Sequence, residues 1–124
     1  MFFGRINDKR NLELLIKAID FLRKNYNVCL LFVGDITESY ENDFNNKINS
    51  KNYIFHSRAI YSNDYLKYIF EQSYLMVYPE GVGLAGLHSM KYGLPVLTHD
   101  EITFQKPEVE AILMLSNNSI FKRN

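Results

Sequence analysis

Two short segments combine residue types that could bind a phosphorylated ligand. The first is Gly4-Arg5-Ile6-Asn7-Asp8-Lys9-Arg10-Asn11, which places three cations at the entrance to an expected helix. Arginine suits phosphate because its two parallel N–H donors match two phosphate oxygens. A basic run of this kind, taken alone, is more often a solvated surface turn. The segment is therefore a candidate anion site with a simpler alternative explanation.

The second segment is Pro79-Glu80-Gly81-Val82-Gly83-Leu84, between an expected strand and an expected helix. Closely spaced glycines let the backbone approach a ligand, and the N–H groups at a helix start favour an anion such as a diphosphate. The carboxylate of Glu80, beside such an anion site, is better suited to accept hydrogen bonds from hydroxyl groups than to contact the anion. A sugar joined to a diphosphate supplies both groups. The simpler alternative is a tight strand-to-helix turn that merely needs glycine.

Short apolar strands alternating with amphipathic helices must position these segments. Apolar strand-like runs occupy 1–3, 28–33, 53–55, 75–78 and 95–98, and helical periodicity covers 12–22, 40–48, 65–70 and 84–92. Asn11 and Ser62 are the expected N-caps. The alternation predicts an α/β fold, a Rossmann-like three-layer sandwich with a parallel sheet, in a single domain over residues 1–124. Both segments would then follow strand carboxyl ends, where such sheets bind ligands.

Composition narrows the classes of function. The 14 basic and 14 acidic residues cancel, which argues against nucleic-acid or membrane-surface binding. Cys29 is the only cysteine and lies in an apolar run, so we expect an inert core residue and an intracellular protein. No apolar stretch is long enough to span a bilayer, and no signal peptide is recognisable. No clustered carboxylates suggest a metal site.

Five ordered motifs resemble the carboxyl-terminal domain of GT-B glycosyltransferases of the group-one, family-four type. They are Gly4-Arg5-Ile6 with Arg10 at the place of a family lysine, Val33-Gly34-Asp35, Glu80-Gly81-Val82-Gly83-Leu84, His88-Ser89-Met90 and Gly93-Leu94-Pro95-Val96. The resemblance covers nearly the whole chain and implies half of a GT-B fold. The main departure is His88, which stands where the family has the glutamate that grips the ribose hydroxyls. An imidazole can both donate and accept a hydrogen bond, so it could hold the same group.

The resemblance also implies roles for individual residues. Arg5 and Arg10 would act in catalysis by neutralising the departing diphosphate, and Glu80 by accepting hydrogen bonds from the transferred sugar. The remaining donor-binding residues would be Lys9, Gly81, Val82, Gly83, Leu84 and His88, with the backbone N–H groups of Gly83 and Leu84 on phosphate. The resemblance implies neither a metal nor a cofactor. The residues of 55–58 lie where such domains position the base.

The function implied by the resemblance is donor binding in a retaining glycosyltransferase of polysaccharide biosynthesis. The partners would be a nucleoside-diphosphate sugar and a glycan or lipid-linked acceptor, the acceptor being held by an N-terminal domain that we expect to be missing from this fragment. We therefore expect the chain alone to be inactive. The expected location is the cytoplasm, with peripheral attachment to the inner membrane, through the missing part, as an option for the full-length protein.

Two alternatives come from other functional classes. One is a remnant that binds nucleotides but has lost sugar transfer, consistent with His88 and with ends that look truncated. The other is a receiver-like signalling domain, which would use a phosphorylatable aspartate at the end of a central strand. Asp35 is the only candidate for that role, and it lacks the expected acidic neighbours. Nucleoside diphosphate binding separates the receiver from the other two hypotheses.

Overall fold

Strands and helices alternate along the chain, as the sequence predicts. The computed structural model describes residues 1–101, 105, 107–110 and 119–121. Two units are distinguished: the first is Phe2–Ile60, and the second is Met1 together with Tyr61–Asn124. Each unit has a three-stranded sheet whose strand pairs are all parallel. The expected α/β, Rossmann-like class is thereby confirmed, whereas the single-domain assignment stays a prediction.

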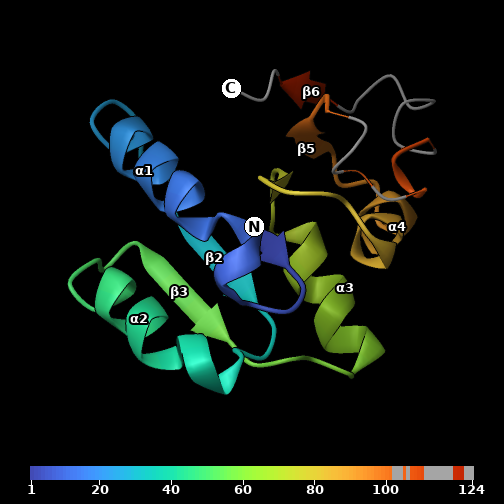
Figure 1. Ribbon diagram of the computed structural model, residues 1–124. Helices are drawn as coiled ribbons and strands as arrows, with labels where there is room; N and C mark the ends of the chain where they lie inside the picture. Colours follow the sequence, from blue (N-terminus) through green and yellow to red (C-terminus); the bar gives the residue numbers. More distant parts are fainter. Residues whose placement is uncertain (102–104, 106, 111–118, 122–124) are drawn as a thin grey trace. The chain divides into compact units, whose positions relative to one another are not determined.

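The first unit is built on the strands β1 (Phe2–Phe3), β2 (Leu30–Val33) and β3 (Ile54–Ser57), in the order β1-β2-β3. Phe32 pairs with Phe2 on one side and with His56 on the other. The central strand β2 is almost entirely buried, which agrees with its apolar sequence. Strands β2 and β3 lie side by side in Figure 1.

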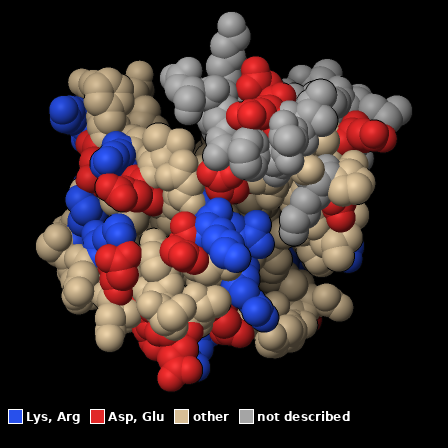
Figure 2. Space-filling model, in the orientation of Figure 1, with Lys and Arg blue, Asp and Glu red and all other residues tan. Residues whose placement is uncertain are grey.

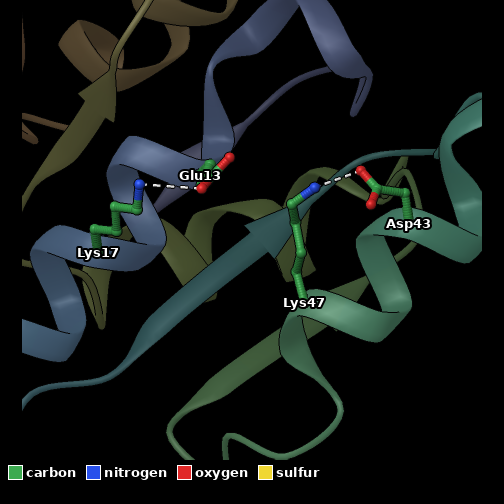
Figure 3. A network of polar contacts seen from close by, with 4 residues as sticks. All are labelled: Glu13, Lys17, Asp43 and Lys47. Atoms are coloured by element: carbon green, nitrogen blue, oxygen red, sulfur yellow. Dashed lines mark hydrogen bonds and ion pairs between the residues drawn. The ribbon is translucent and has the colours of Figure 1, made fainter.

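Two helices accompany this sheet, α1 (Leu12–Leu22) and α2 (Glu38–Ile48). Both bury one face, as their three-and-four residue spacing requires. The ring of Phe44 on α2 meets the ring of Phe32 edge-on at 5.1 Å between centroids, which seats the helix on the sheet. Figure 3 shows an ion pair between residues four apart on each helix: Glu13–Lys17 on α1, which is exposed (3.1 Å), and Asp43–Lys47 on α2, which is partly exposed.

The second unit contains β4 (Met76–Tyr78), β5 (Val96–His99) and β6 (Ser119–Phe121), in the order β4-β5-β6, with helices α3 (Asn63–Glu71) and α4 (Leu84–Lys91). Tyr78 pairs with Thr98, so β4 and β5 end at the same sheet edge. Figure 1 shows β5 and β6 side by side. Met76 and Val96 are fully buried and form the centre of this unit's core.

Both expected helix caps occupy cap positions, but only one works through its side chain. Ser62 accepts a hydrogen bond from the Tyr65 backbone N–H (3.4 Å), as predicted. Asn11 precedes α1 without any cap hydrogen bond from its side chain. The reason is that Asn11 also ends the short 3₁₀ helix Asp8–Arg10, where its backbone is left-handed (φ 50°). Asparagine tolerates that conformation better than most residues.

The expectation of a buried Cys29 is wrong, because the residue is exposed. Strand β2 begins at Leu30, so the apolar run of the sequence starts two residues before the sheet does. None of the helices within the described residues has the length and apolarity needed to cross a membrane.

Candidate functional site

The loop after β1 alternates between residues tied to the sheet and residues turned to solvent. Gly4 donates its N–H to the Val33 carbonyl (2.9 Å), and Ile6 donates to the Asp35 carbonyl (3.0 Å). Ile6 is fully buried, whereas Arg5 between the two is exposed. This alternation follows from the extended backbone of a strand end, which turns successive side chains to opposite sides. Arg5 is therefore held at the carboxyl end of β1 with its side chain accessible.

The other two predicted cations lie in the 3₁₀ helix that follows, Asp8–Arg10. The Asn7 side chain caps this turn by accepting the Lys9 backbone N–H (3.1 Å). Lys9 is exposed and Arg10 half-buried. Basic side chains gather in Figure 2 over the region where Figure 1 draws this loop. The structure thus places Arg5, Lys9 and Arg10 on one ordered loop at the carboxyl edge of the first sheet.

The neighbouring strand ends complete this edge with internal hydrogen bonds. His56 bonds through Nε2 to the Gly34 carbonyl (2.8 Å), and its ring meets Phe44 edge-on. An Asp35 carboxylate oxygen accepts the Ala59 backbone N–H (3.1 Å) and so holds the loop after β3 against the end of β2. The two side chains fasten β3 and the loop after it to the residues that follow β2. His56 therefore has a structural partner, and the side chain of the receiver-type candidate Asp35 is engaged by the backbone N–H of Ala59.

The glycine-containing loop after β4 is mostly inside the second unit. Gly81 and Val82 are buried, Glu80 and Gly83 are half-buried, and Leu84 is exposed. Gly83 is the N-cap of α4 and has an extended backbone (φ −112°, ψ −155°). Positive φ is found instead at Gly4, Gly34 and Gly93. A left-handed backbone therefore does not account for the glycines at 81 and 83.

The start of α4 presents the groups that an anion would use. Leu84 is the first helical residue after Gly83, and the first backbone N–H groups of a helix have no acceptor within it. His88 follows Leu84 by four residues, so both lie on one side of the helix, and both are exposed. Ser89, the next residue, is fully buried and faces the core. The structure thus places the side chains of Leu84 and His88 on one accessible side of α4, with the Leu84 N–H at the start of the helix.

Gln105 was missed by the sequence reasoning, although it touches the glycine loop directly. Its side-chain oxygen accepts the Val82 backbone N–H at 3.0 Å. Its side-chain nitrogen donates to the Thr98 hydroxyl (3.0 Å) and to the His99 carbonyl (2.7 Å). No motif or spacing pointed to this residue, because a single glutamine in a polar stretch resembles any surface residue.

The predicted site residues are divided between the two units. Arg5, Lys9 and Arg10 belong to the first unit, and Glu80 through His88 belong to the second. Each group follows the carboxyl end of a parallel strand and leads into a helix, the position where such sheets bind ligands. Their convergence on one ligand stays a prediction. Among the residues that the structure describes, no group of three or more His, Cys, Asp or Glu side chains is placed to hold a metal ion.

A comparison with family models decides which family this is. The model of the glycosyl transferases group 1 matches residues 1–111. The chain belongs to the group 1 glycosyl transferases. The matched residues include both candidate loops of this group 1 glycosyl transferase chain. The activity of the family is glycosyl transfer, which needs a sugar donor and an acceptor. A search of curated proteins gave no match.

Proposed function

We propose that this group 1 chain is the donor-binding, carboxyl-terminal half of a family-four GT-B glycosyltransferase. It takes a sugar from a nucleoside-diphosphate sugar and passes it, with retention, to a glycan or lipid-linked acceptor in polysaccharide biosynthesis. One observation carries the proposal: the family match includes both anion-suited loops, and each loop stands between the carboxyl end of a parallel strand and a helix. This is where α/β sheets bind phosphorylated ligands.

In this proposal the basic loop, residues 4–11, stabilises the diphosphate leaving group. As the bond between sugar and diphosphate breaks, negative charge develops on the diphosphate, and preplaced cations stabilise that charge. Arg5 is exposed on a loop whose neighbours Gly4 and Ile6 are hydrogen-bonded to the adjacent strand end. The backbone that carries its guanidinium is thus ordered before the ligand binds. Arg10 and Lys9 supply further positive charge from the same loop.

The loop after β4, residues 79–84 and called the glycine loop, binds the phosphate and sugar groups of the donor in this proposal. The backbone N–H groups of Gly83 and Leu84 bind phosphate at the positive end of α4, and Gly81 and Val82 shape the loop. Glu80 accepts hydrogen bonds from hydroxyls of the transferred sugar. His88, exposed one turn into α4, contacts the ribose. These roles require neither a metal nor a resident cofactor, and the acceptor is held by a second GT-B domain.

The test of this proposal is nucleoside diphosphate binding, with Arg5→Ala/Arg10→Ala as the decisive variant. Isothermal titration of the chain with UDP, GDP and ADP should show binding of at least one of them. Each charge-assisted contact contributes about 1.5–3 kcal/mol, so the double variant should weaken binding by roughly a hundredfold or more. Arg5 is exposed and Arg10 half-buried, so the melting temperature should change little.

The matched control is Lys24→Ala, which removes an exposed cation beyond the carboxyl end of α1, away from the strand ends that carry the candidate loop. Its affinity should equal that of the unaltered chain. Equal affinity in the double variant would remove Arg5 and Arg10 from the site, and absence of binding to all three nucleotides would contradict the proposed function.

A second experiment tests whether the chain alone is active. Mixed with a labelled nucleotide sugar and acceptor, the chain alone should transfer no sugar; robust transfer would show that a second domain is unnecessary.

A further inference from the structure

The glycine loop is fastened at its centre by one side chain from another part of the second unit. Gln105 accepts the Val82 backbone N–H (3.0 Å), and Val82 itself is fully buried. Val82 lies between Gly81 and Gly83, and glycine restrains the backbone less than any other residue. Without an anchor, the peptide groups of this loop could rotate. The hydrogen bond from Val82 fixes one of them.

Gln105 is itself held in one orientation by three partners of the same unit. Its nitrogen donates to the His99 carbonyl (2.7 Å), which can only accept, and its oxygen receives the Val82 N–H, which can only donate. Reversing the amide would break both bonds, so only one orientation satisfies the contacts. The nitrogen also donates to Thr98 (3.0 Å), whose hydroxyl donates to the Tyr78 carbonyl (3.2 Å).

This chain of hydrogen bonds joins the ends of two adjacent strands. Tyr78 ends β4 and Thr98 lies opposite it on β5. From this pair the contacts run through Gln105 to the loop that leads into α4. Thr98, His99 and Val82 are all fully buried and Gln105 is half-buried, so the bond from Thr98 to Tyr78 is buried and the three bonds of Gln105 are partly buried. The loop geometry is thus tied to the sheet edge before any ligand arrives.

We infer that Gln105 is a positioning residue that presets the glycine loop for the donor diphosphate. By engaging the Val82 N–H, it keeps that group turned inward and leaves the amides at the start of α4 to bind phosphate. A loop ordered in advance loses less conformational entropy on binding. The inference rests on the proposed function in one respect, that the loop binds the diphosphate; the anchoring of Val82 is independent of it.

The experiment compares Gln105→Leu with the unaltered chain by two measurements. The first is hydrogen exchange of the Val82 amide, followed by NMR without ligand; we expect exchange to become about tenfold faster or more when the acceptor is lost. The second is titration with inorganic pyrophosphate and with UDP, GDP and ADP, where we expect affinity to fall about tenfold. Gln72→Leu, a change of the same type at an exposed position after α3, should alter neither.

Thr98→Val provides a second variant in case the leucine variant does not fold. It preserves the shape of a strand residue, removes one acceptor of the Gln105 nitrogen and should give the same changes to a smaller degree. Unchanged Val82 exchange in a folded Gln105→Leu chain would overturn the anchoring. Faster exchange with unchanged affinity would overturn the link to the ligand. Lack of binding by the unaltered chain, with Val82 protected, would count against the proposed function and leave the anchoring standing.

Discussion

Gly34 shows how a single residue at the end of a strand fixes the start of the basic loop. Its backbone has φ +153°, and a Cβ added there would lie 1.8 Å from the Gly4 carbonyl oxygen. That contact is with backbone, which cannot move aside like a flexible side chain. The close approach is what brings the end of β2 against the end of β1, where Arg5 begins its loop.

At the residue scale, Gly34→Ala should destabilise the first unit severely. The strained φ and the clash together should lower the free energy of unfolding by about 3 kcal/mol or more. Gly93→Ala is the matched control, because Gly93 also has positive φ (+70°) but nothing within 4 Å of an added Cβ. It should cost about 1–2 kcal/mol, the cost of the left-handed conformation alone. Urea unfolding measures both, and equal losses would show that the close contact to Gly4 is unimportant.

At the scale of elements, Asp20 connects α1 to the segment that leads into β3. Its carboxylate accepts hydrogen bonds from Lys51 (2.7 Å) and from the Tyr53 hydroxyl (2.5 Å). The Arg23 guanidinium lies over the Tyr53 ring at 4.8 Å. The hydrogen bonds from Lys51 and Tyr53 lower the pKa of Asp20 below its ordinary value of 3.8. This cluster joins the two elements through specific contacts in addition to apolar packing.

The lowered pKa of Asp20 predicts how stability depends on pH. Because the folded state binds the proton less tightly than the unfolded state, the contribution is complete above pH 3.8 and is lost as the pH falls through the folded-state pKa. Asp20→Asn should therefore lower the free energy of unfolding by about 1 kcal/mol at neutral pH, and the difference should shrink in acid. The measurement is urea unfolding at several pH values.

Glu13→Gln is the control for this prediction. It removes an exposed ion pair with Lys17 on the same helix, drawn in Figure 3. Such a pair contributes little, so the loss should be about 0.5 kcal/mol or less. An Asp20 effect that stayed constant down to about pH 2 would show that its contacts do not depend on ionisation.

At the scale of the whole molecule, the basic loop and the glycine loop belong to different units. The proposed function requires them to bind one diphosphate. Leu84→Pro tests the glycine loop selectively, because proline fits the first position of a helix and removes the backbone N–H there. The Leu84 side chain is 69% exposed, so no core packing is lost. Leu84→Ala, which keeps the N–H, is the control.

We expect Leu84→Pro to weaken nucleoside diphosphate binding about tenfold and Leu84→Ala to leave it unchanged. Combined with Arg5→Ala, the proline variant should show coupling: the double loss should differ from the product of the single losses, because both groups act on the same anion. Isothermal titration of the four chains gives the cycle. Independent effects, or an effect of Arg5 alone, would place the two loops at separate sites.

The sequence by itself determined the α/β class, the helices and most strand positions, because apolar periodicity and turn residues are local signals. It also identified the family later found by comparison. The tertiary structure decided what depends on neighbours distant in sequence: the exposure of Cys29, the left-handed backbone of Asn11, and Gln105 as the anchor of Val82. The Val82–Gln105 bond spans 23 residues and joins a backbone group to an ordinary polar side chain, so it leaves no periodic or compositional trace in the sequence.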